Sequence, residues 1–497
     1  MERPLMRDER SLRSVARLLS AVLVEDDIMI SGMTQTSQEI EPGDIFLAFP
    51  GGKTHGARFT AQAAARGARA VLTDPVGAGV IKEIACDLPV VVVDDPRRAA
   101  GILSAWFYNE PMRDLYCVGI TGTNGKTTTT TLLQQIWTRS GRESGLIGTV
   151  ETRIGADLLK SKRTTPESSE LQALIATMRE RHVRNLAMEV SSHAISLQRI
   201  RGAHFAVVAF TNLTQDHLDF HDTMEAYFQA KASLFSFEYA DLAMINIDDP
   251  YGARLVQISE IPVRTLSRSG QGANWSYVSA HAHLRGNDVC IRGQGGILIE
   301  GVLHLHGDYN LDNALMAVAL AYESGVDPIE IAAILPTLSG AQGRLESVDA
   351  GQDFAAFVDY AHSPDSVSRV LEACRSMTSG KVIAVLGCGG DRDSSKRPLM
   401  GRALSSGCDV AVFTSDNPRS EDPLKILEQM TKGLAVAEPD KVISDRRIAI
   451  DYAVSKAVAG DVVVILGKGH ETGQESAGVI TPFDDRLALA QAIEARP

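Results

Sequence analysis

The stretch Tyr116-Cys-Val-Gly-Ile-Thr-Gly-Thr-Asn-Gly-Lys-Thr-Thr-Thr decides the fold of this chain. A short apolar strand runs into a glycine-rich loop that ends in Gly125-Lys126-Thr127, and a helix follows. This order is typical of a phosphate-binding loop, because backbone N–H groups at a helix N-terminus point at phosphate oxygens. Lys126 would add a point charge for the terminal phosphates, and the Thr127 hydroxyl can ligate Mg²⁺. The common spacing G-x-x-x-x-G-K-T is not kept, since Ile120 stands where that pattern has its first glycine.

Outward from this loop, apolar segments of strand length alternate with segments of helical pattern. The expected strands are 116–120, 185–189, 205–212 and 242–246, and the expected helices are 97–108, 126–140, 224–235 and 311–324. Alternation of this kind predicts a parallel, doubly wound sheet. Between residues 267 and 305 the pattern changes to short strands of alternating polarity, which predicts an antiparallel insertion.

The same rhythm divides the chain into three blocks. The first holds short strands at 44–49, 70–73 and 90–93 with a helix at 60–66, and the last holds strands at 354–359, 382–386, 410–414 and 462–466. We predict an α/β protein of three domains: a small α/β N-terminal domain (1–96), a central domain with a doubly wound parallel sheet and the phosphate loop (97–338), and a Rossmann-like C-terminal domain (339–497). A dinucleotide is not expected in the last domain, since Arg392 takes the place of the third glycine of G-x-G-x-x-G.

Composition narrows the class of protein. The 497 residues carry 49 Lys and Arg against 62 Asp and Glu, a net charge of −13, which argues against a nucleic-acid or anionic-membrane partner. The six cysteines are spread out with no C-x-x-C pair, as in a reducing compartment. The apolar patch at 18–23 predicts an amphipathic helix rather than a signal peptide, and no run of ~18 apolar residues occurs. We therefore predict a cytoplasmic monomer that acts on small molecules.

Acidic and histidine side chains follow two of the central strands. Glu189 comes at the end of a strand of the sheet that carries the phosphate loop, which suits a hard cation such as Mg²⁺. The segment 211–221 holds an Asp/His cluster with mixed ligands and no nearby cysteine, so Mg²⁺ beside a nucleotide is favoured over a transition metal. Lys231 comes after His217 in the chain and lies on the expected helix 224–235. Its position on that helix alone predicts a lysine whose side chain is solvated.

A series of motifs resembles the Mur ligase family and its folylpolyglutamate synthase relatives. In chain order they are Thr121-Gly-Thr-Asn-Gly-Lys-Thr-Thr, Thr164-Thr-Pro-Glu, Glu189-Val-Ser-Ser-His, Thr211-Asn-Leu, Asp216-His-Leu-Asp, Lys231, Asp312-Asn, Gly343-Arg-Leu-Glu, Asp359-Tyr-Ala-His, Gly387-Cys-Gly-Gly-Asp-Arg-Asp, Asp416-Asn-Pro-Arg and Gly467-Lys-Gly-His-Glu. The resemblance covers nearly the whole chain. It extends to the members that add the third residue of the peptidoglycan stem peptide.

The resemblance implies four groups of site residues. ATP is expected at Gly122, Thr123, Asn124, Gly125, Lys126, Thr127, Thr128, Asn313 (adenine), Arg344 and Asp359 (ribose). UDP-muramoyl-dipeptide is expected at Ser37, Gly52, Lys53, Thr54, Thr164, Thr165, Ser191 and Arg199. Diaminopimelate is expected at Arg392, Asp416, Asn417, Pro418, Arg419, Gly467 and Glu471. Mg²⁺ is expected on Thr127, Glu189, His217 and a carbamylated Lys231, and Lys126, Lys231 and His217 are the implied catalytic residues.

The implied reaction is ligation between the central and C-terminal domains. ATP phosphorylates the γ-carboxylate of D-Glu in UDP-MurNAc-L-Ala-D-Glu, and the amine of meso-diaminopimelate displaces phosphate, with domain closure. Arg419 would bind the second carboxylate of diaminopimelate. With lysine instead, Arg419 would stay buried and unpaired, so rejection on the order of 10⁴ is expected. Three alternatives remain open: the same enzyme with L-lysine, a folylpolyglutamate synthase, and a phosphate-loop ATPase that couples hydrolysis to movement.

Overall fold

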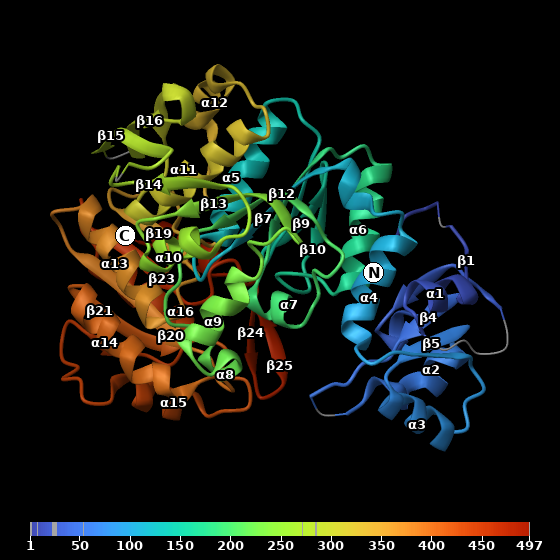
Figure 1. Ribbon diagram of the computed structural model, residues 1–497. Coiled ribbons are helices and arrows are strands. Elements are labelled where there is room, and N and C mark those ends of the chain that lie inside the picture. Colours follow the sequence, from blue (N-terminus) through green and yellow to red (C-terminus); the bar gives the residue numbers. More distant parts are fainter. Residues whose placement is uncertain are drawn as a thin grey trace.

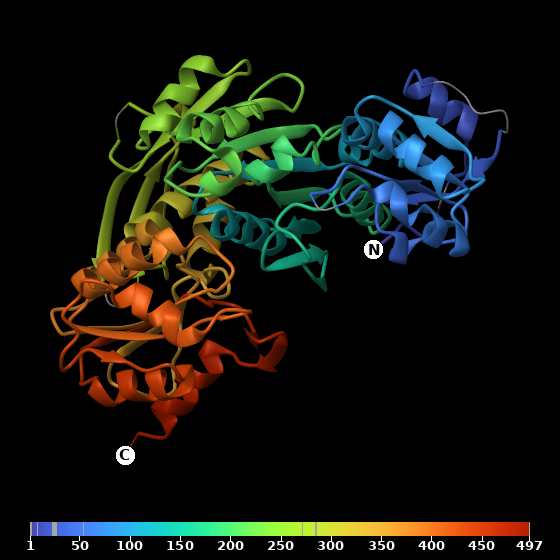
Figure 2. The ribbon, with the colours of Figure 1, turned by 90° about the horizontal axis from the view of Figure 1, so that it is seen from below.

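The structure is a computed structural model that describes residues 2–6, 8–21, 27–52, 54–270, 272–283 and 286–496. Within these residues the strands form three large sheets of four, eleven and six strands, which follow one another along the chain (Figure 1). The first sheet lies at one end of the molecule and the last at the other, with the central sheet between them (Figure 2). In the part of the chain described here, no helix has the length and apolar character needed to span a membrane. The prediction of an α/β protein is confirmed.

The phosphate loop follows an interior strand of the central sheet. β7 (Tyr116–Thr121) pairs in parallel with β11 (Asn185–Glu189) on one side and β12 (Phe205–Phe210) on the other. The parallel part continues through β8 (Ser144–Ile147), β13 (Ala240–Asn246), β14 (Val263–Ser267) and β15 (Trp275–His283). Because the carboxyl ends of parallel strands share one edge, the loops after β7, β11 and β12 meet there.

Antiparallel strands form both edges of this sheet. β9 (Glu151–Ile154) and β10 (Asp157–Lys160) continue from β8, and β16 (Gly286–Arg292) and β17 (Leu298–Leu303) continue from β15. The antiparallel strands expected between residues 267 and 305 are therefore present, but they extend the central sheet at its edge. The strands β8 to β10 had no counterpart in the sequence prediction.

Helices cover both faces of the central sheet. Val118 and Ile120 of β7 face a core with α5 (Lys126–Arg139), α11 (Asp308–Glu323) and α12 (Pro328–Ile334). Cys117 faces the opposite core, which contains side chains of α6 (Ser168–Glu180), α7 (Ser192–Ser196), α9 (Met224–Ala232) and α10 (Pro250–Ile258). The period-two alternation of a strand sends neighbouring side chains to opposite faces, and burial of both faces explains the nearly continuous apolar runs. The short helix α8 (Leu218–His221) lies before α9.

The N-terminal sheet is parallel, in the order β3 (Gly32–Thr34), β4 (Asp44–Leu47), β5 (Ala70–Thr73) and β6 (Val90–Val92). Its helices are α1 (Leu12–Leu18), α2 (Thr60–Ala65), α3 (Pro75–Glu83) and α4 (Pro96–Phe107), and β1 (Arg10–Ser11) pairs with β2 (Met29–Ile30). The amphipathic helix expected near the N-terminus corresponds to α1. Part of its expected apolar patch falls on residues 22–26, outside the described residues.

The C-terminal sheet has the order β18 (Glu346–Ser347), β19 (Ala355–Asp359), β23 (Val462–Leu466), β20 (Val382–Cys388), β21 (Val410–Ser415), β22 (Lys441–Val442), with β18 antiparallel. One face packs on α13 (Pro364–Met377), α14 (Arg397–Gly407) and α15 (Pro423–Thr431), and the other on α16 (Arg446–Lys456) and α17 (Asp485–Glu494). The strand order reverses around β20 and β23, where ligands of open α/β sheets bind. A hairpin of β24 (Gly473–Ser476) and β25 (Val479–Pro482), which the sequence analysis did not predict, projects from this sheet (Figure 2).

Candidate active site

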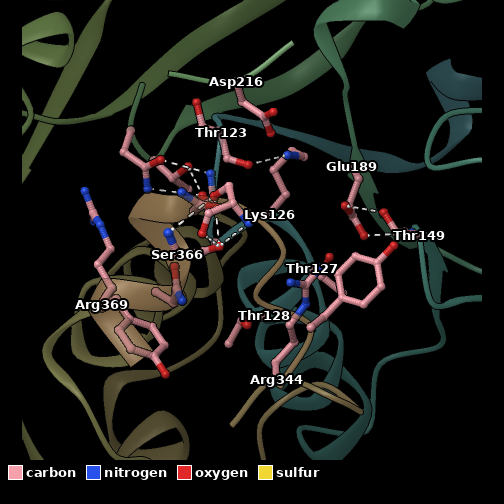
Figure 3. Close-up of a pocket in the computed structure, with 18 of the residues that line it drawn as sticks. Thr123, Lys126, Thr127, Thr128, Thr149, Glu189, Asp216, Arg344, Ser366 and Arg369 are labelled. Atoms are coloured by element: carbon pink, nitrogen blue, oxygen red, sulfur yellow. Dashed lines mark hydrogen bonds between the residues drawn. The ribbon is translucent and has the colours of Figure 1, made fainter. Parts of the chain in front are cut away.

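A cavity of about 430 Å³ lies between the central and C-terminal sheets. The phosphate loop, Glu189 and His217 line it from the central part, and Arg344, Asp359 and Arg392 line it from the C-terminal part. Figure 3 shows Lys126, Thr127 and Thr128 on one side of this space and Ser366 and Arg369 of α13 on another. Motif residues assigned to the central and C-terminal domains thus meet around one cavity, but of the residues assigned to the amino acid only Arg392 lines it.

The phosphate loop has a backbone that only small residues fit. Gly125 precedes α5 with φ +88°, and a Cβ atom there would overlap Asn313 Oδ1. A Cβ at Gly122 would overlap the Thr211 hydroxyl. Glycine is therefore needed at both positions for the backbone N–H groups to face the cavity.

Lys126 is hydrogen-bonded to the backbone of its own loop. Its ammonium donates hydrogen bonds to the carbonyl oxygens of Gly122 at 2.9 Å and of Thr123 at 3.0 Å. Burial lowers the pKa of Lys126, although Glu189 opposes the shift. Lys126 is half-buried, and its hydrogen-bond partners among the described residues are backbone carbonyls, so an entering phosphate would meet a charge that no carboxylate in contact neutralises.

Glu189 is a buried carboxylate with a fixed orientation. It accepts hydrogen bonds from the Thr149 backbone N–H at 2.8 Å and the Thr149 hydroxyl at 3.0 Å (Figure 3). The Thr149 hydroxyl also contacts the Thr164 hydroxyl at 2.9 Å. Sequence reasoning missed Thr149, because it lies in an irregular loop after β8 and belongs to none of the motifs.

His217 and Asp216 lie at the start of α8. Burial lowers the pKa of His217 to about 4, although Asp216 opposes the shift, so its imidazole is neutral near pH 7. Burial opposes ionisation of Asp216, but His217 and Lys396 lower its pKa to about 2. Lys396 reaches across from the C-terminal part and donates to Asp216 at 2.8 Å. This ion pair joins the two sides of the cavity.

Lys231 is buried, so the prediction of a solvated lysine from its helix position alone is wrong. Its Nζ donates to the Gly122 carbonyl at 2.9 Å and lies 4.7 Å from the centre of the Tyr227 ring. Burial and the nearby Lys126 lower the pKa of Lys231 well below its ordinary value. Lys231 is not among the residues that line the cavity. In the ranges that the structure describes, no three His, Cys, Asp or Glu side chains gather in a way that could hold a metal ion.

The residues expected to contact the nucleotide line the cavity, except Gly122. The buried Asp359 accepts backbone hydrogen bonds from Leu345 at 2.6 Å and Ala361 at 2.7 Å, and burial raises its pKa. Arg344 stacks on Tyr360 at 4.6 Å. Asn313 accepts from the Thr129 hydroxyl at 3.4 Å, which places it at the start of α5.

The residues expected to contact UDP-muramoyl-dipeptide lie in two groups. In the central part the Thr165 hydroxyl donates to the Glu189 carbonyl at 2.9 Å and accepts from the Ser191 N–H at 3.1 Å, which ties Thr164, Thr165 and Ser191 to the end of β11. Arg199 pairs with Glu167 at 2.9 Å. The second group, Ser37, Gly52 and Thr54, lies in the N-terminal part, where Ser37 donates to Gln62. Lys53 lies outside the described residues.

The residues expected to hold the amino acid follow β20, β21 and β23. Asn417 donates to Glu471 at 2.8 Å, and Lys468 donates to Asn417 and Glu471, both at 3.1 Å. Lys468 is fully buried and belongs to the Gly467-Lys-Gly-His-Glu motif, but sequence reasoning gave it no role. The contact was not predictable, because the buried lysine meets its partners only when the two loops fold together.

A buried ion pair supports these loops from behind. Arg446 pairs with Asp485 at 2.6 Å, and both side chains are fully buried. The same guanidinium donates to the carbonyls of Ser415 at 3.2 Å and Leu466 at 2.9 Å. It therefore joins the last residues of β21 and β23, from which the amino-acid motifs begin.

The expectation that Arg419 is buried and unpaired without diaminopimelate is wrong. Its side chain is one quarter exposed, donates to the Gly390 carbonyl at 2.5 Å and lies 3.6 Å from Glu475 of β24. Arg392 is close by: a Cβ on Gly389 would lie 3.1 Å from Arg419 Nη1 and 3.8 Å from Arg392 Cγ. The hairpin that supplies Glu475 could not be predicted from the sequence, which is why its carboxylate was missed.

Other side chains that line the cavity were not assigned from the sequence. They are Thr149, Thr211, Asn212, Asp216, Asn246, Tyr309, Asp312, Met316, Tyr360, His362, Ser363, Ser366, Arg369 and Val370. Several belong to the quoted motifs, so the motifs located them without indicating a role. Burial raises the pKa of Asp312 to about 6, with Arg268 opposing the shift.

Comparisons with known proteins agree with this arrangement. Residues 29–108 match the model "Mur ligase family, catalytic domain", residues 120–321 match "Mur ligase middle domain", and residues 343–469 match "Mur ligase, glutamate ligase domain". The chain belongs to the Mur ligase family. The three matches cover the three sheets, so this Mur ligase has a counterpart of each part of the family fold.

The similarity to individual Mur ligases extends over almost the whole length. A UDP-N-acetylmuramoyl-L-alanyl-D-glutamate–2,6-diaminopimelate ligase of Streptomyces coelicolor is 46% identical over 99% of this chain and 98% of the relative. The ligase of the same name from Bacillus licheniformis is 39% identical over 94% and 96%. A solved structure with this name superposes with a TM-score of 0.69 at 31% identity, over 99% of both chains. A MurF ligase of Thermotoga maritima in complex with ADP shares the fold, with a TM-score of 0.64 at 18% identity over 93% and 97%.

Proposed function

We propose that this chain is an ATP-dependent ligase that adds meso-diaminopimelate to UDP-N-acetylmuramoyl-L-alanyl-D-glutamate in peptidoglycan precursor synthesis. The observation that carries the proposal is the 46% identity to the Streptomyces coelicolor ligase over 99% of this chain. Because that similarity includes the N-terminal, central and C-terminal parts, it covers both sides of the cavity. The proposal also accounts for the phosphate loop and the arginines at one cavity, since two substrates are anionic.

ATP is the proposed co-substrate. The phosphate loop and Lys126 would hold the phosphates, and Arg344, Asn313 and Asp359 would hold the nucleoside side. The MurF ligase of Thermotoga maritima and a folylpolyglutamate synthase of Mycobacterium tuberculosis, both of this fold, carry ADP in their solved structures. In this proposal a terminal phosphate would replace the two loop carbonyls as the partners of Lys126.

The donors near the loop fit Mg²⁺ only in part. Glu189 and the Thr127 hydroxyl are oxygen donors of the kind that Mg²⁺ prefers, and His217 is neutral and able to donate a lone pair. Lys231 as an amine would not bind Mg²⁺, whereas its carbamate would supply two anionic oxygens. The lowered pKa of Lys231 favours the neutral amine, which is the form that reacts with CO₂. When bound, Mg²⁺ would neutralise phosphate charge.

In the proposed reaction the D-Glu γ-carboxylate attacks the γ-phosphorus of ATP, and ADP leaves. The amine of diaminopimelate then attacks the acyl phosphate carbon, phosphate departs from the tetrahedral intermediate, and the amine proton goes to solvent or a nearby base. Lys126 would stabilise the charge on the transferring group. Arg199 and the hydroxyls of Thr165 and Ser191 would orient the peptide carboxylates.

The choice of diaminopimelate over L-lysine is assigned to Arg419. A guanidinium can bind the second carboxylate through two charge-assisted hydrogen bonds. Lysine has no such group and would make no such bonds to Arg419. Because Arg419 has other partners in the ligand-free chain, the discrimination comes from hydrogen bonds that diaminopimelate makes and lysine cannot make. It does not come from a charge that bound lysine leaves unpaired.

The test is a panel of amino acids assayed with UDP-MurNAc-L-Ala-D-Glu and ATP, with phosphate release and the tripeptide product measured together. We expect product with meso-diaminopimelate and little with L-lysine. Comparable kcat/KM for the two would refute the assigned specificity. Phosphate release that does not require the UDP-muramoyl-dipeptide would support the ATPase alternative, and glutamate addition to a folate would support the folylpolyglutamate synthase alternative.

A further inference from the structure

Glu475 is a carboxylate with no role in the reaction described above, and it lies beside the arginine that would select the amino acid. Its Oε2 is 3.6 Å from Arg419 Nε, and the two side chains are 40% and 25% exposed. Ion pairing therefore occurs at the surface of the ligand-free chain, within reach of solutes.

The hairpin of β24 and β25 fixes this carboxylate next to Arg419. The Arg419 N–H donates to the Glu475 carbonyl at 3.0 Å, and Ala477 N–H donates to the Arg419 carbonyl at 2.6 Å. Glu475 N–H in turn donates to Asn417 Oδ1 at 2.9 Å. Arg419 has φ +52°, an uncommon conformation that these backbone contacts hold. The pairing is thus a built feature of the loop rather than a chance contact of two long side chains.

We propose that Glu475 occupies on Arg419 the place that the second carboxylate of the diamino acid takes when it binds, and so acts as an internal competitor that tunes specificity. The inference rests on the proposed function. Binding of diaminopimelate exchanges one carboxylate for another on the same guanidinium, and Glu475 returns to water. Binding of lysine involves no exchange, so Arg419 keeps Glu475.

The exchange makes a distinctive prediction for Glu475→Gln, which keeps the size of the side chain and removes its charge. The KM for meso-diaminopimelate should fall about two- to five-fold, the range that corresponds to an exposed ion pair. The KM for L-lysine and kcat for diaminopimelate should stay unchanged. Glu494→Gln, which removes an exposed carboxylate from α17, is the matched control and should change neither KM.

A second variant separates competition from a structural effect. In an Arg419→Ala background the guanidinium is absent, so Glu475→Gln should leave the KM for diaminopimelate unchanged. All KM values are measured at saturating ATP and UDP-muramoyl-dipeptide, with the melting temperature of each variant as the test of folding. A melting temperature lowered by Glu475→Gln, together with a raised KM for both amino acids, would show a structural role and overturn the proposal.

The remaining outcomes are equally decisive. An unchanged KM for diaminopimelate in Glu475→Gln overturns the proposal. A KM that rises for both amino acids at unchanged melting temperature also overturns it, because Glu475 would then bind an ammonium group that they share. If either of these results is found while the wild-type enzyme turns over diaminopimelate, the proposed function remains intact. A wild-type enzyme that incorporates lysine and not diaminopimelate overturns the function and the inference together.

Discussion

The central and C-terminal sheets present their ligand sites at the same place, the carboxyl ends of parallel strands, but they prepare their cations differently. In the central part Lys126 is held by backbone carbonyls of its own loop. In the C-terminal part Lys468 is held by Asn417 and Glu471, and Arg419 lies beside Glu475. In the central site the hydrogen-bond partners of the cation are neutral carbonyls, whereas in the C-terminal site each cation has a carboxylate beside its neutral partners.

This difference bears on affinity and selectivity. An anion that reaches Lys126 replaces neutral partners with a charge, so binding gains the difference between a bond to an anion and the bonds to neutral carbonyls. An anion that reaches Arg419 replaces another anion, so the net free energy of binding is small and depends on geometry. The first arrangement suits a co-substrate that must bind tightly, and the second suits discrimination between similar amino acids.

The largest effect is expected at Lys126. Lys126→Ala should lower kcat for ligation by about 10³-fold, because it removes the one lysine of the phosphate loop that would face the transferring phosphate. The fold should persist, since the half-buried ammonium contributes desolvation cost along with its hydrogen bonds. Steady-state phosphate release and a melting curve check both statements, with the exposed Lys425→Ala as control. Near-normal turnover of Lys126→Ala would contradict the phosphate-loop assignment.

A smaller but still severe loss is expected at Lys231. Lys231→Ala should lower kcat by about 10²-fold, since no carbamate can form and Mg²⁺ loses an anionic ligand. High bicarbonate should not restore activity, whereas small carboxylic acids should restore part of it by supplying the missing oxygens. Mass spectrometry of the native protein under CO₂ tests the modification directly. An unmodified Lys231 in an active, substrate-bound enzyme would make the carbamate hypothesis wrong.

At the C-terminal site the effect should be confined to one substrate. Arg419→Ala should lower kcat/KM for meso-diaminopimelate by about 10- to 100-fold, the worth of hydrogen bonds to a charged group, and leave L-lysine little changed. The kcat/KM of Arg419→Lys for meso-diaminopimelate should lie between those of the wild type and Arg419→Ala, because an ammonium cannot make two parallel bonds to a carboxylate. This expected loss of about 10- to 100-fold in kcat/KM replaces the rejection of lysine on the order of 10⁴ that a buried, unpaired arginine would give. Equal losses for both amino acids would contradict a role in discrimination.

Much of the sheet architecture could be predicted, because strands buried on both faces leave continuous apolar runs. Three of the expected strands have the same bounds in the structure: 185–189 is β11, 70–73 is β5 and 462–466 is β23. Among the strands that were missed, β10 and β25 are mostly exposed, so no apolar pattern marks them. They exist because their backbones pair with a neighbouring strand, which a composition-based argument does not detect.

The site was predictable to the extent that motifs mark it. Motif residues of both the central and the C-terminal part line one cavity, although Lys231 and Asp416–Arg419 do not, and the partner of each charged group depends on the fold. Thr149 orients Glu189 from a loop without a motif, and Glu475 reaches Arg419 from an unpredicted hairpin. The pairing of Lys396 with Asp216 likewise joins residues 180 positions apart. Sequence thus indicated which chemistry is present, and tertiary contacts determined which charges are already neutralised.

The smallest effect is expected from a pair of neighbouring glycines at the amino-acid site. A methyl group on Gly389 would lie 3.1 Å from Arg419 Nη1, the tip of a flexible side chain, so a small shift of the guanidinium relieves it. A methyl group on Gly390 would overlap the carbonyl oxygen of Pro418, which is backbone and cannot turn aside. Gly389→Ala should therefore raise the KM for meso-diaminopimelate by about two- to five-fold at unchanged melting temperature, a loss of the size of one exposed ion pair.

Gly390→Ala places a methyl group in the same loop as Gly389→Ala, but against backbone and not against a flexible side chain. It should lower the melting temperature or the kcat/KM much more, because the loop that carries Arg392 would have to move away from the loop that carries Arg419. Since the Gly390 N–H also donates to the Asn417 carbonyl at 2.9 Å, that movement would break a bond between the two loops. Kinetics with both amino acids and a melting curve for each variant distinguish the cases. If the two alanine variants behaved alike, the guanidinium of Arg419 would be as rigid as backbone, and exchange of its carboxylate partner would no longer explain selectivity at this site.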